Sequence, residues 1–232
     1  MGQNAEVEAL LETAEVVSVE DVGMGVTNPK NVILQAGDRT IRAVFKPIPR
    51  GRHKGFWESY QAEVAAYKLD KLLGLNMVPP TVVKRIDRKT GSLQYWVDDC
   101  QLYRDVQGQP PQKPVEWSHQ LSRMKMFDNL IQNRDRNAQN FLVDPDWHIV
   151  LIDHSRAFIS DKKLPKNVKM LPSQFDRRLV EKLKALDEDD LKRRFKGVLM
   201  GGQVKGILAR RDALLEYLGK LIAEKGEARV LF

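Results

Sequence analysis

The stretch IQNRDRNAQNFLVDPDWHIVLIDHSRAF, residues 131–158, decides how this chain folds. A polar segment leads into an apolar strand, and after a turn a second apolar strand ends on Asp153. The turn reads DPD, residues 144–146, a sequence typical of tight turns. A hairpin of these strands brings Asn140, which precedes the first strand, close to Asp153. The sequence therefore predicts that polar residues at the open end of the hairpin share one site.

The residue types at that end fit a metal and phosphate site. Asn140 and Asp153 offer oxygen ligands, and Mg²⁺ often needs only one or two carboxylates beside phosphate oxygens. Asp135 lies five residues before Asn140 and would be free to orient or deprotonate a hydroxyl group. The alternative for each residue is a purely local role, because Asp and Asn also form turns at strand ends.

The N-terminal part of the chain is dominated by strand patterns. A short helical pattern over residues 6–16 comes first, and residues 49–55 have the composition of a loop. The spacing of apolar residues predicts a helix over 57–73, with Gly74 in the C-cap position. The predicted strands are EVVSVEDV, NVILQA, TIRAVFKPI and two strands within residues 77–99 around a turn at 88–91.

Two features of this part could hold a phosphate group, and a glutamate could support one of them. Gly23 and Gly25 join two predicted strands, where backbone N–H groups can approach a phosphate closely. Lys46 ends a strand, and Glu63 lies at the edge of the apolar stripe of helix 57–73. A partly buried glutamate needs a partner, and Lys46 is the expected one. A plain turn, a solvated lysine and an exposed glutamate are the alternatives.

The C-terminal part is mainly helical. Residues 104–116 are rich in Pro and Gly and form the best candidate for a linker. A helix is predicted over 117–132, a basic loop over 161–174 and further helices over 175–226. The predicted organisation is a lobe at 1–103, a linker at 104–116 and a helical lobe at 117–232. This α+β arrangement places a cleft between two lobes, where ligands commonly bind.

Composition limits the protein class. The 232 residues are 42% hydrophobic and 30% charged, as in globular proteins, and no apolar run is long enough to span a bilayer. A single cysteine, Cys100, and the lack of a signal peptide favour the cytoplasm. The net charge of +7 gathers in short runs that suit an acidic partner, anionic lipid, a nucleotide or solvent. Nucleic acid is less favoured, because aromatic residues do not alternate with the basic ones.

The motifs together resemble the protein-kinase-like superfamily. The resemblance rests on AVFK at 43–46, the glutamate in the following helix, D-x-x-x-x-N at 135–140 and an apolar strand that ends on aspartate. NRDRNAQN looks most like the atypical branch of phosphatidylinositol 3- and 4-kinases, HipA-type kinases and secretory-pathway kinases. Two positions depart from the pattern: His154-Ser155 replaces Phe-Gly, and Asn137 replaces the histidine of the lipid-kinase loop.

The resemblance implies a two-lobed fold, with a small antiparallel-sheet lobe that carries one helix and a compact, mainly helical second lobe. It also implies a role for each motif residue. Lys46 would bind the α- and β-phosphates and pair with Glu63, and Asp135 would be the catalytic aspartate. Asn140 and Asp153 would hold the metal ion.

The same resemblance implies how the rest of the nucleotide is bound. Gly23 and Gly25 would cover the phosphates. Residues near Tyr95, Val97 and Asp98 would meet adenine through their backbone groups.

The implied function is an ATP-dependent phosphotransferase that uses Mg²⁺ or Mn²⁺. The γ-phosphate would pass to a hydroxyl group of protein Ser or Thr, a lipid or a small molecule. Two alternatives stay open: a kinase-like enzyme that transfers AMP, and a non-catalytic pseudokinase or basic binding module.

Overall fold

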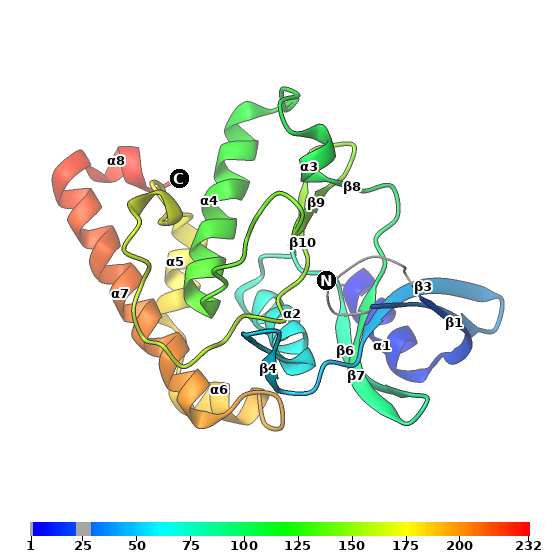
Figure 1. Ribbon diagram of the computed structural model, residues 1–232. Helices are drawn as coiled ribbons and strands as arrows, with labels where there is room; N and C mark the ends of the chain where they lie inside the picture. The colour runs from blue at the N-terminus through cyan, green and yellow to red at the C-terminus, as the bar shows by residue number, and fades with distance from the viewer. Residues whose placement is uncertain (1, 22–28) are drawn as a thin grey trace.

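The computed structural model describes residues 2–21 and 29–232, which form a sheet-rich N-terminal part and a helical C-terminal part (Figure 1). Gly23 and Gly25 lie outside the described residues. The main sheet is antiparallel and five-stranded, in the order β1-β2-β3-β7-β6. Its strands are β1 (Glu15–Asp21), β2 (Lys30–Ala36), β3 (Arg39–Lys46), β6 (Thr81–Ile86) and β7 (Lys89–Tyr95).

The alternation of β3 separates its core residues from its site residues. Ala43 and Phe45 are buried in the core that the sheet forms with helix α1 (Gly2–Thr13). Val44 and Lys46 point to the opposite face and line a cavity. Because β3 pairs with β7, Val44 lies opposite Gln94. The small lobe thus has helix α1 on one face of its sheet in addition to the helix that the sequence predicts over 57–73.

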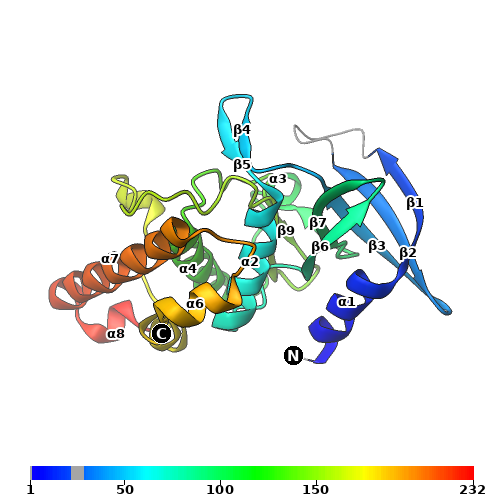
Figure 2. The same cartoon turned by 90° about the horizontal axis from the view of Figure 1, so that it is seen from below.

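A short hairpin precedes the second helix. The sequence predicted a loop over 49–55 and a helix from 57, but β4 (Gly51–His53) pairs with β5 (Phe56–Glu58). Helix α2 (Tyr60–Leu73) begins later because Ser59 is its N-cap and accepts a hydrogen bond from the Ala62 N–H at 3.2 Å. Gly74 ends the helix in the left-handed conformation, as predicted. Figure 2 shows the β4–β5 hairpin projecting from the body of the molecule.

The turn between β6 and β7 is tighter than predicted. Asp87 and Arg88 both have positive φ, 48° and 65°, as the two central residues of a type I′ hairpin turn require. The predicted turn at 88–91 therefore shrinks, and Lys89 to Gly91 join strand β7.

The chain passes from the sheet to the helical part at residues 96–100. Strand β8 (Gln101–Leu102) already pairs with β9 (Phe141–Val143) of the C-terminal part. Residues 104–116, where the sequence placed a linker, follow this crossing and contain most of helix α3 (Tyr103–Val106) and the start of α4 (Pro114–Ile131).

A second core lies around α4 and α7 of the helical part and also takes in the buried apolar side chains of α2. The remaining elements of the helical part are β10 (Ile149–Leu151), η1 (Val168–Met170), α5 (Arg177–Lys184), α6 (Glu188–Arg194), α7 (Gly201–Lys225) and α8 (Glu227–Val230). The buried Arg210 of α7 donates to the carbonyls of Leu130 at 2.8 Å and Ile159 at 3.3 Å and also to that of Asp161. One side chain thus ties α7 to the end of α4 and to the segment that follows Asp153.

A buried carboxylate fixes the end of α2. Asp70 accepts hydrogen bonds from the N–H groups of Met77 and Val78 at 2.9 and 3.2 Å. Burial raises the pKa of Asp70 to about 7, although these hydrogen bonds oppose the shift. The folded state therefore holds the Asp70 proton more tightly than the unfolded state does.

This linkage predicts a pH dependence of stability. The contribution of protonated Asp70 is complete below the unfolded-state pKa of about 4 and is lost as the pH rises through about 7. Asp70→Asn removes that dependence but keeps an oxygen acceptor. Urea unfolding from about pH 4 to about pH 8 should show the wild type losing up to a few kcal/mol relative to the variant. A difference that stays constant with pH would contradict the buried, protonated carboxyl group.

Candidate active site

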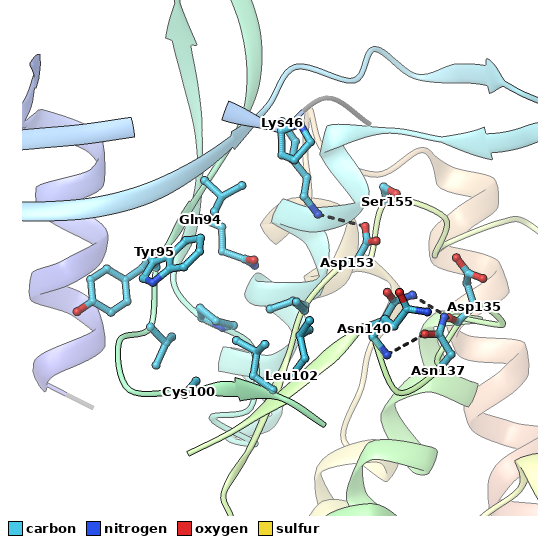
Figure 3. A pocket seen from close by; sticks show the side chains of 18 of the residues that line it. Lys46, Gln94, Tyr95, Cys100, Leu102, Asp135, Asn137, Asn140, Asp153 and Ser155 are labelled. Atoms are coloured by element: carbon cyan, nitrogen blue, oxygen red, sulfur yellow. Dashed lines mark hydrogen bonds and ion pairs between the residues drawn. The ribbon is translucent and has the colours of Figure 1, made fainter. Parts of the chain in front are cut away.

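A cavity of about 700 Å³ lies between the sheet and the β9–β10 hairpin (Figure 3). One end is walled mainly by apolar side chains, and the other end gathers charged ones. Among the sequence-predicted residues, the cavity is lined by Lys46, Tyr95, Val97, Asp135, Asn140 and Asp153. Glu63 lies behind Lys46, whereas Asp98 is not part of the lining and its carboxylate pairs with Arg42.

The predicted ion pair between Lys46 and Glu63 is present. The Lys46 Nζ lies 2.6 Å from Glu63 Oε1 and 3.1 Å from Asp153 Oδ1. Burial alone would lower the pKa of Lys46, but the charges of Glu63 and Asp153 outweigh it and raise the pKa above its usual value. The ammonium is thus charged, fixed between the sheet and the hairpin, and aimed at the cavity.

Glu63 is almost fully buried and uses both carboxylate oxygens. While Oε1 pairs with Lys46, Oε2 accepts a hydrogen bond from the backbone N–H of His154 at 2.9 Å. Burial would raise the pKa of Glu63, but Lys46, with help from His154, lowers it below its usual value. The glutamate therefore stays ionised and binds α2 to the segment just after Asp153.

His154 fills the position where the kinase pattern has Phe. Its ring is completely buried and packs edge-on against Phe127, with 6.2 Å between ring centroids. An Arg136 NH2 group lies 2.9 Å from Nε2, so Nε2 accepts and the proton sits on Nδ1. Burial, with the nearby Arg136 charge, lowers the pKa of His154, although Glu63 opposes the shift. The His154 side chain is thus an uncharged aromatic ring in the core, and its Nε2 atom accepts a hydrogen bond from Arg136.

The hairpin brings Asn140 and Asp153 together, as the sequence predicted. Phe141 of β9 pairs with Leu151 of β10, and the Ile152 N–H donates to the Asn140 carbonyl at 3.3 Å. The amide of Asn140 donates to the Asp135 carbonyl at 2.9 Å. Asp153 has a φ of 58°, a left-handed conformation that aspartate tolerates better than most residues.

Asp135 was expected from the sequence to be free, but the side chain of Arg156 holds its carboxylate. The Arg156 NH1 group lies 2.9 Å from Asp135 Oδ2, and Arg156 Nε lies 2.7 Å from the buried Glu58 carboxylate. The Arg156 guanidinium also stacks on the Phe56 ring, 4.0 Å from its centroid. This arginine fixes the direction of the Asp135 carboxylate and adds a cation to the cavity.

Arg136 connects the polar loop to its surroundings. It forms a two-point ion pair with Asp128 of α4, with both contacts at 3.0 Å. It also donates to the carbonyls of Asn140, just before β9, and Ile152, just after β10. Asn137, which stands in place of the lipid-kinase histidine, ties the loop together locally. Its amide donates to the Asp135 carbonyl at 2.9 Å.

Four residues that shape this site were not predicted from the sequence: Glu58, Gly91, Arg136 and Arg156. For Arg136 a signal was present, because its place beside Asp135 in NRDRNAQN is part of the quoted motif. Glu58 and Arg156 are far apart in the sequence, and neither has a motif of its own. Only the fold brings them together.

The donor atoms fit a divalent cation that is shared with phosphate. Asp153 and Asn140 line the same part of the cavity and offer carboxylate and amide oxygens, the hard ligands that Mg²⁺ and Mn²⁺ take. Within residues 2–21 and 29–232, no three His, Cys, Asp or Glu side chains converge on one point. A cation held here would complete its shell with phosphate oxygens and water.

The fold and this site define a protein-kinase-like enzyme of the atypical branch. The family model described as phosphatidylinositol 3- and 4-kinase matches residues 8–201. The chain therefore belongs to that family.

Two solved structures share the fold. Hydra Fam20 with sugar has a TM-score of 0.76 at 15% identity, over 100% of this chain and 92% of that one. The Helicobacter pylori proinflammatory kinase CtkA has a TM-score of 0.57 at 12% identity, over 91% of this chain and 97% of that one. These similarities agree with the predicted two-lobed, kinase-like fold.

One curated relative matches part of the chain. Protein Rv2133c of Mycobacterium tuberculosis is 26% identical over 163 residues, which cover 55% of this chain and 58% of that protein. Across the described part of the chain, no helix combines the length and the apolar character that crossing a membrane requires.

Gly91 is predicted to be essential for the position of Lys46. A Cβ atom at residue 91 would lie 2.6 Å from the Lys46 carbonyl oxygen and 2.7 Å from the Phe45 ring. Gly91→Ala should cost about 1–3 kcal/mol of stability, because strand β3 must move. Chemical denaturation measures this cost. Gly219→Ala is the matched control, since a Cβ there meets nothing within 4 Å, and equal effects of both changes would contradict the role of Gly91.

His154 is predicted to matter as a hydrogen-bond acceptor in the core. His154→Leu leaves one Arg136 donor without its partner and should cost about 1–3 kcal/mol in urea unfolding. His148→Leu breaks only an exposed pair with Asp144 and should cost less than about 1 kcal/mol. A neutral or stabilising His154→Leu would show that the buried ring acts by shape alone.

Proposed function

We propose that this kinase transfers the γ-phosphate of ATP to a hydroxyl group and requires Mg²⁺ or Mn²⁺. The observation that carries the proposal is the Lys46 ammonium, held by Glu63 at 2.6 Å and Asp153 at 3.1 Å beside the cavity. A buried cation kept charged by two carboxylates is suited to bind the phosphates of a nucleotide.

The cavity is divided in a way that suits ATP. Apolar side chains of Val44, Leu142 and Ile152 line it together with Lys46, Asp135 and Asp153. A flat base fits between the apolar walls, while the phosphates reach the charged end. Tyr95 and Val97 line the same cavity, and we propose that their backbone groups meet adenine.

Asn140 and Asp153 are the proposed metal ligands. Asp153 Oδ1 faces Lys46, and its second oxygen is available to a cation. The amide of Asn140 donates to the Asp135 carbonyl, which leaves Oδ1 of Asn140 as the ligand atom. A divalent cation bound there neutralises phosphate charge and aligns the group that is transferred.

Asp135 is the proposed acceptor of the hydroxyl proton. Its carboxylate lines the cavity and is held in one direction by the 2.9 Å contact with Arg156. The backbone carbonyl of Asp135 is held by Asn137 and Asn140, each at 2.9 Å. A base fixed in this way can meet an incoming hydroxyl without prior reorganisation. Protein Ser or Thr, a lipid and a small molecule are the candidate acceptors.

The proposal predicts metal-dependent nucleotide binding that depends on Asp153. Mg²⁺ together with ATP should raise the melting temperature of the wild type, because a ligand that binds the folded state stabilises it. Asp153→Asn should lose the Mg²⁺-dependent part of that shift. Asp146→Asn changes an exposed aspartate in the hairpin turn and serves as the matched control. A shift that is the same in both variants would contradict the metal site.

Turnover is tested separately with ATP labelled on the γ-phosphate, using protein and lipid mixtures as acceptors. The wild type should label an acceptor or itself, and Asp135→Asn should lose at least about tenfold of the rate, because general-base catalysis is worth that much or more. Mass analysis of the product distinguishes a phosphate group from AMP. Transfer of AMP would overturn the proposed reaction.

A further inference from the structure

We propose that Gln94, oriented by Thr81, makes the nucleotide site selective for adenine over 6-oxopurines. The inference rests on the proposed function, because it requires the base of a nucleotide in the apolar end of the cavity. It assigns the base specificity to one buried side chain and to the residue that fixes that side chain.

A chain of hydrogen bonds determines which way the Gln94 amide points. The Thr81 hydroxyl lies 2.8 Å from the Pro79 carbonyl oxygen, which can only accept, so the hydroxyl donates its single proton there. The Thr81 oxygen must therefore accept from Gln94, whose Nε2 lies 2.9 Å away. This arrangement makes Nε2 the buried atom of the amide and leaves Oε1 on the other side.

The other side of the amide is the cavity. Gln94 is among the residues that line it, and Figure 3 shows the Gln94 side chain pointing into it. Among the described residues, none donates a hydrogen bond to Oε1. Thr81 and Gln94 are 2% and 8% exposed, so the pair is fixed by packing and cannot turn freely. Oε1 of Gln94 thus presents a side-chain hydrogen-bond acceptor to the cavity, on a wall whose described side chains are otherwise largely apolar.

The position of this acceptor matches the base and not the phosphates. Gln94 lies opposite Val44 in the sheet, and Lys46 is two residues further along β3. In a strand, residues i and i+2 point to the same face and lie about 7 Å apart. With the phosphates at Lys46, that spacing leaves room for a ribose and places the base against Val44 and Gln94.

The chemistry of the two purines then differs at one edge. Adenine carries a 6-amino donor, whereas guanine carries a 6-oxo acceptor. The amino group can donate to Gln94 Oε1. A 6-oxo group would set two lone pairs against each other in a dry part of the site and leave both unpaired. Rejection by unpaired buried groups is a strong source of specificity.

The test compares the binding of ATP and inosine triphosphate, which carries a 6-oxo group and no 2-amino group. Isothermal titration with Mg²⁺ should show the wild type binding ATP about 10- to 100-fold more tightly. Gln94→Leu should reduce this ratio to within a few-fold. Gln109→Leu changes an exposed glutamine outside the cavity and should leave the ratio unchanged.

Thr81 provides the sharper test, because it is placed behind Gln94 and outside the cavity lining. Thr81→Val removes the acceptor for Nε2, so the amide can turn its NH₂ group toward a 6-oxo purine. The ratio should fall because inosine triphosphate binds more tightly. Thr81→Ser keeps the hydroxyl and should keep the ratio, which separates the hydrogen bond from general damage to the fold.

The outcomes distinguish the inference from the proposed function. A wild type that binds both nucleotides equally overturns the inference alone. An unchanged ratio in folded Thr81→Val overturns the role of Thr81 as the positioning residue. If Thr81→Val does not fold, the ratio in Gln94→Leu and Gln94→Met decides the inference. A wild type that binds neither nucleotide overturns the proposed function itself.

Discussion

The buried carboxylate of Glu63 is the constraint on which the rest of the site depends. A charged group that is 1% exposed is costly unless each oxygen has a partner. One oxygen takes the Lys46 ammonium and the other takes the backbone N–H of His154. Strand β3, helix α2 and the end of the β9–β10 hairpin must therefore meet at one point. The meeting of these three elements is what closes the cavity on its charged side.

A second, largely buried charge organises the polar loop around Asp135 in the same manner. Asp128 of α4 balances the charge of Arg136. The other donors of Arg136 bind His154 and the carbonyls of the residues just before β9 and just after β10. Because His154 contacts both Arg136 and the Glu63 carboxylate region, the two buried ions belong to one connected network. This explains why a histidine can stand where the related pattern has phenylalanine. It keeps an aromatic ring in the core and adds an acceptor that this arginine uses.

The carboxylate proposed as the base has its own support. Arg156 joins Asp135 to the buried Glu58 and stacks on Phe56, so one side chain links the β4–β5 hairpin to Asp135. The chain belongs to the phosphatidylinositol 3- and 4-kinase family and shares its fold with Fam20 and CtkA. The orientation of Asp135, by contrast, depends on contacts that belong to this chain.

The sequence by itself determined the two-part α+β organisation, the β9–β10 hairpin and the pairing of Lys46 with Glu63. These features follow from local patterns: alternating apolar residues, a DPD turn and a glutamate on the apolar edge of a helix. The same patterns placed Asn140 near Asp153, because pairing the two strands around the DPD turn brings together the residues at the open end of the hairpin.

Only the tertiary structure decided how the remaining residues act. Gln94 and Thr81 lie on neighbouring strands, Gly91 lies beneath Lys46, and Arg156 lies between Glu58 and Asp135. Of these residues only Lys46 and Asp135 belong to a motif, and the roles of the others come from the partner that packing supplies. The β4–β5 hairpin and the late start of α2 escaped prediction because the Ser59 cap outweighed the apolar spacing from Trp57. Local preference predicts which elements form, whereas the direction of a buried polar group is set by its neighbours in space.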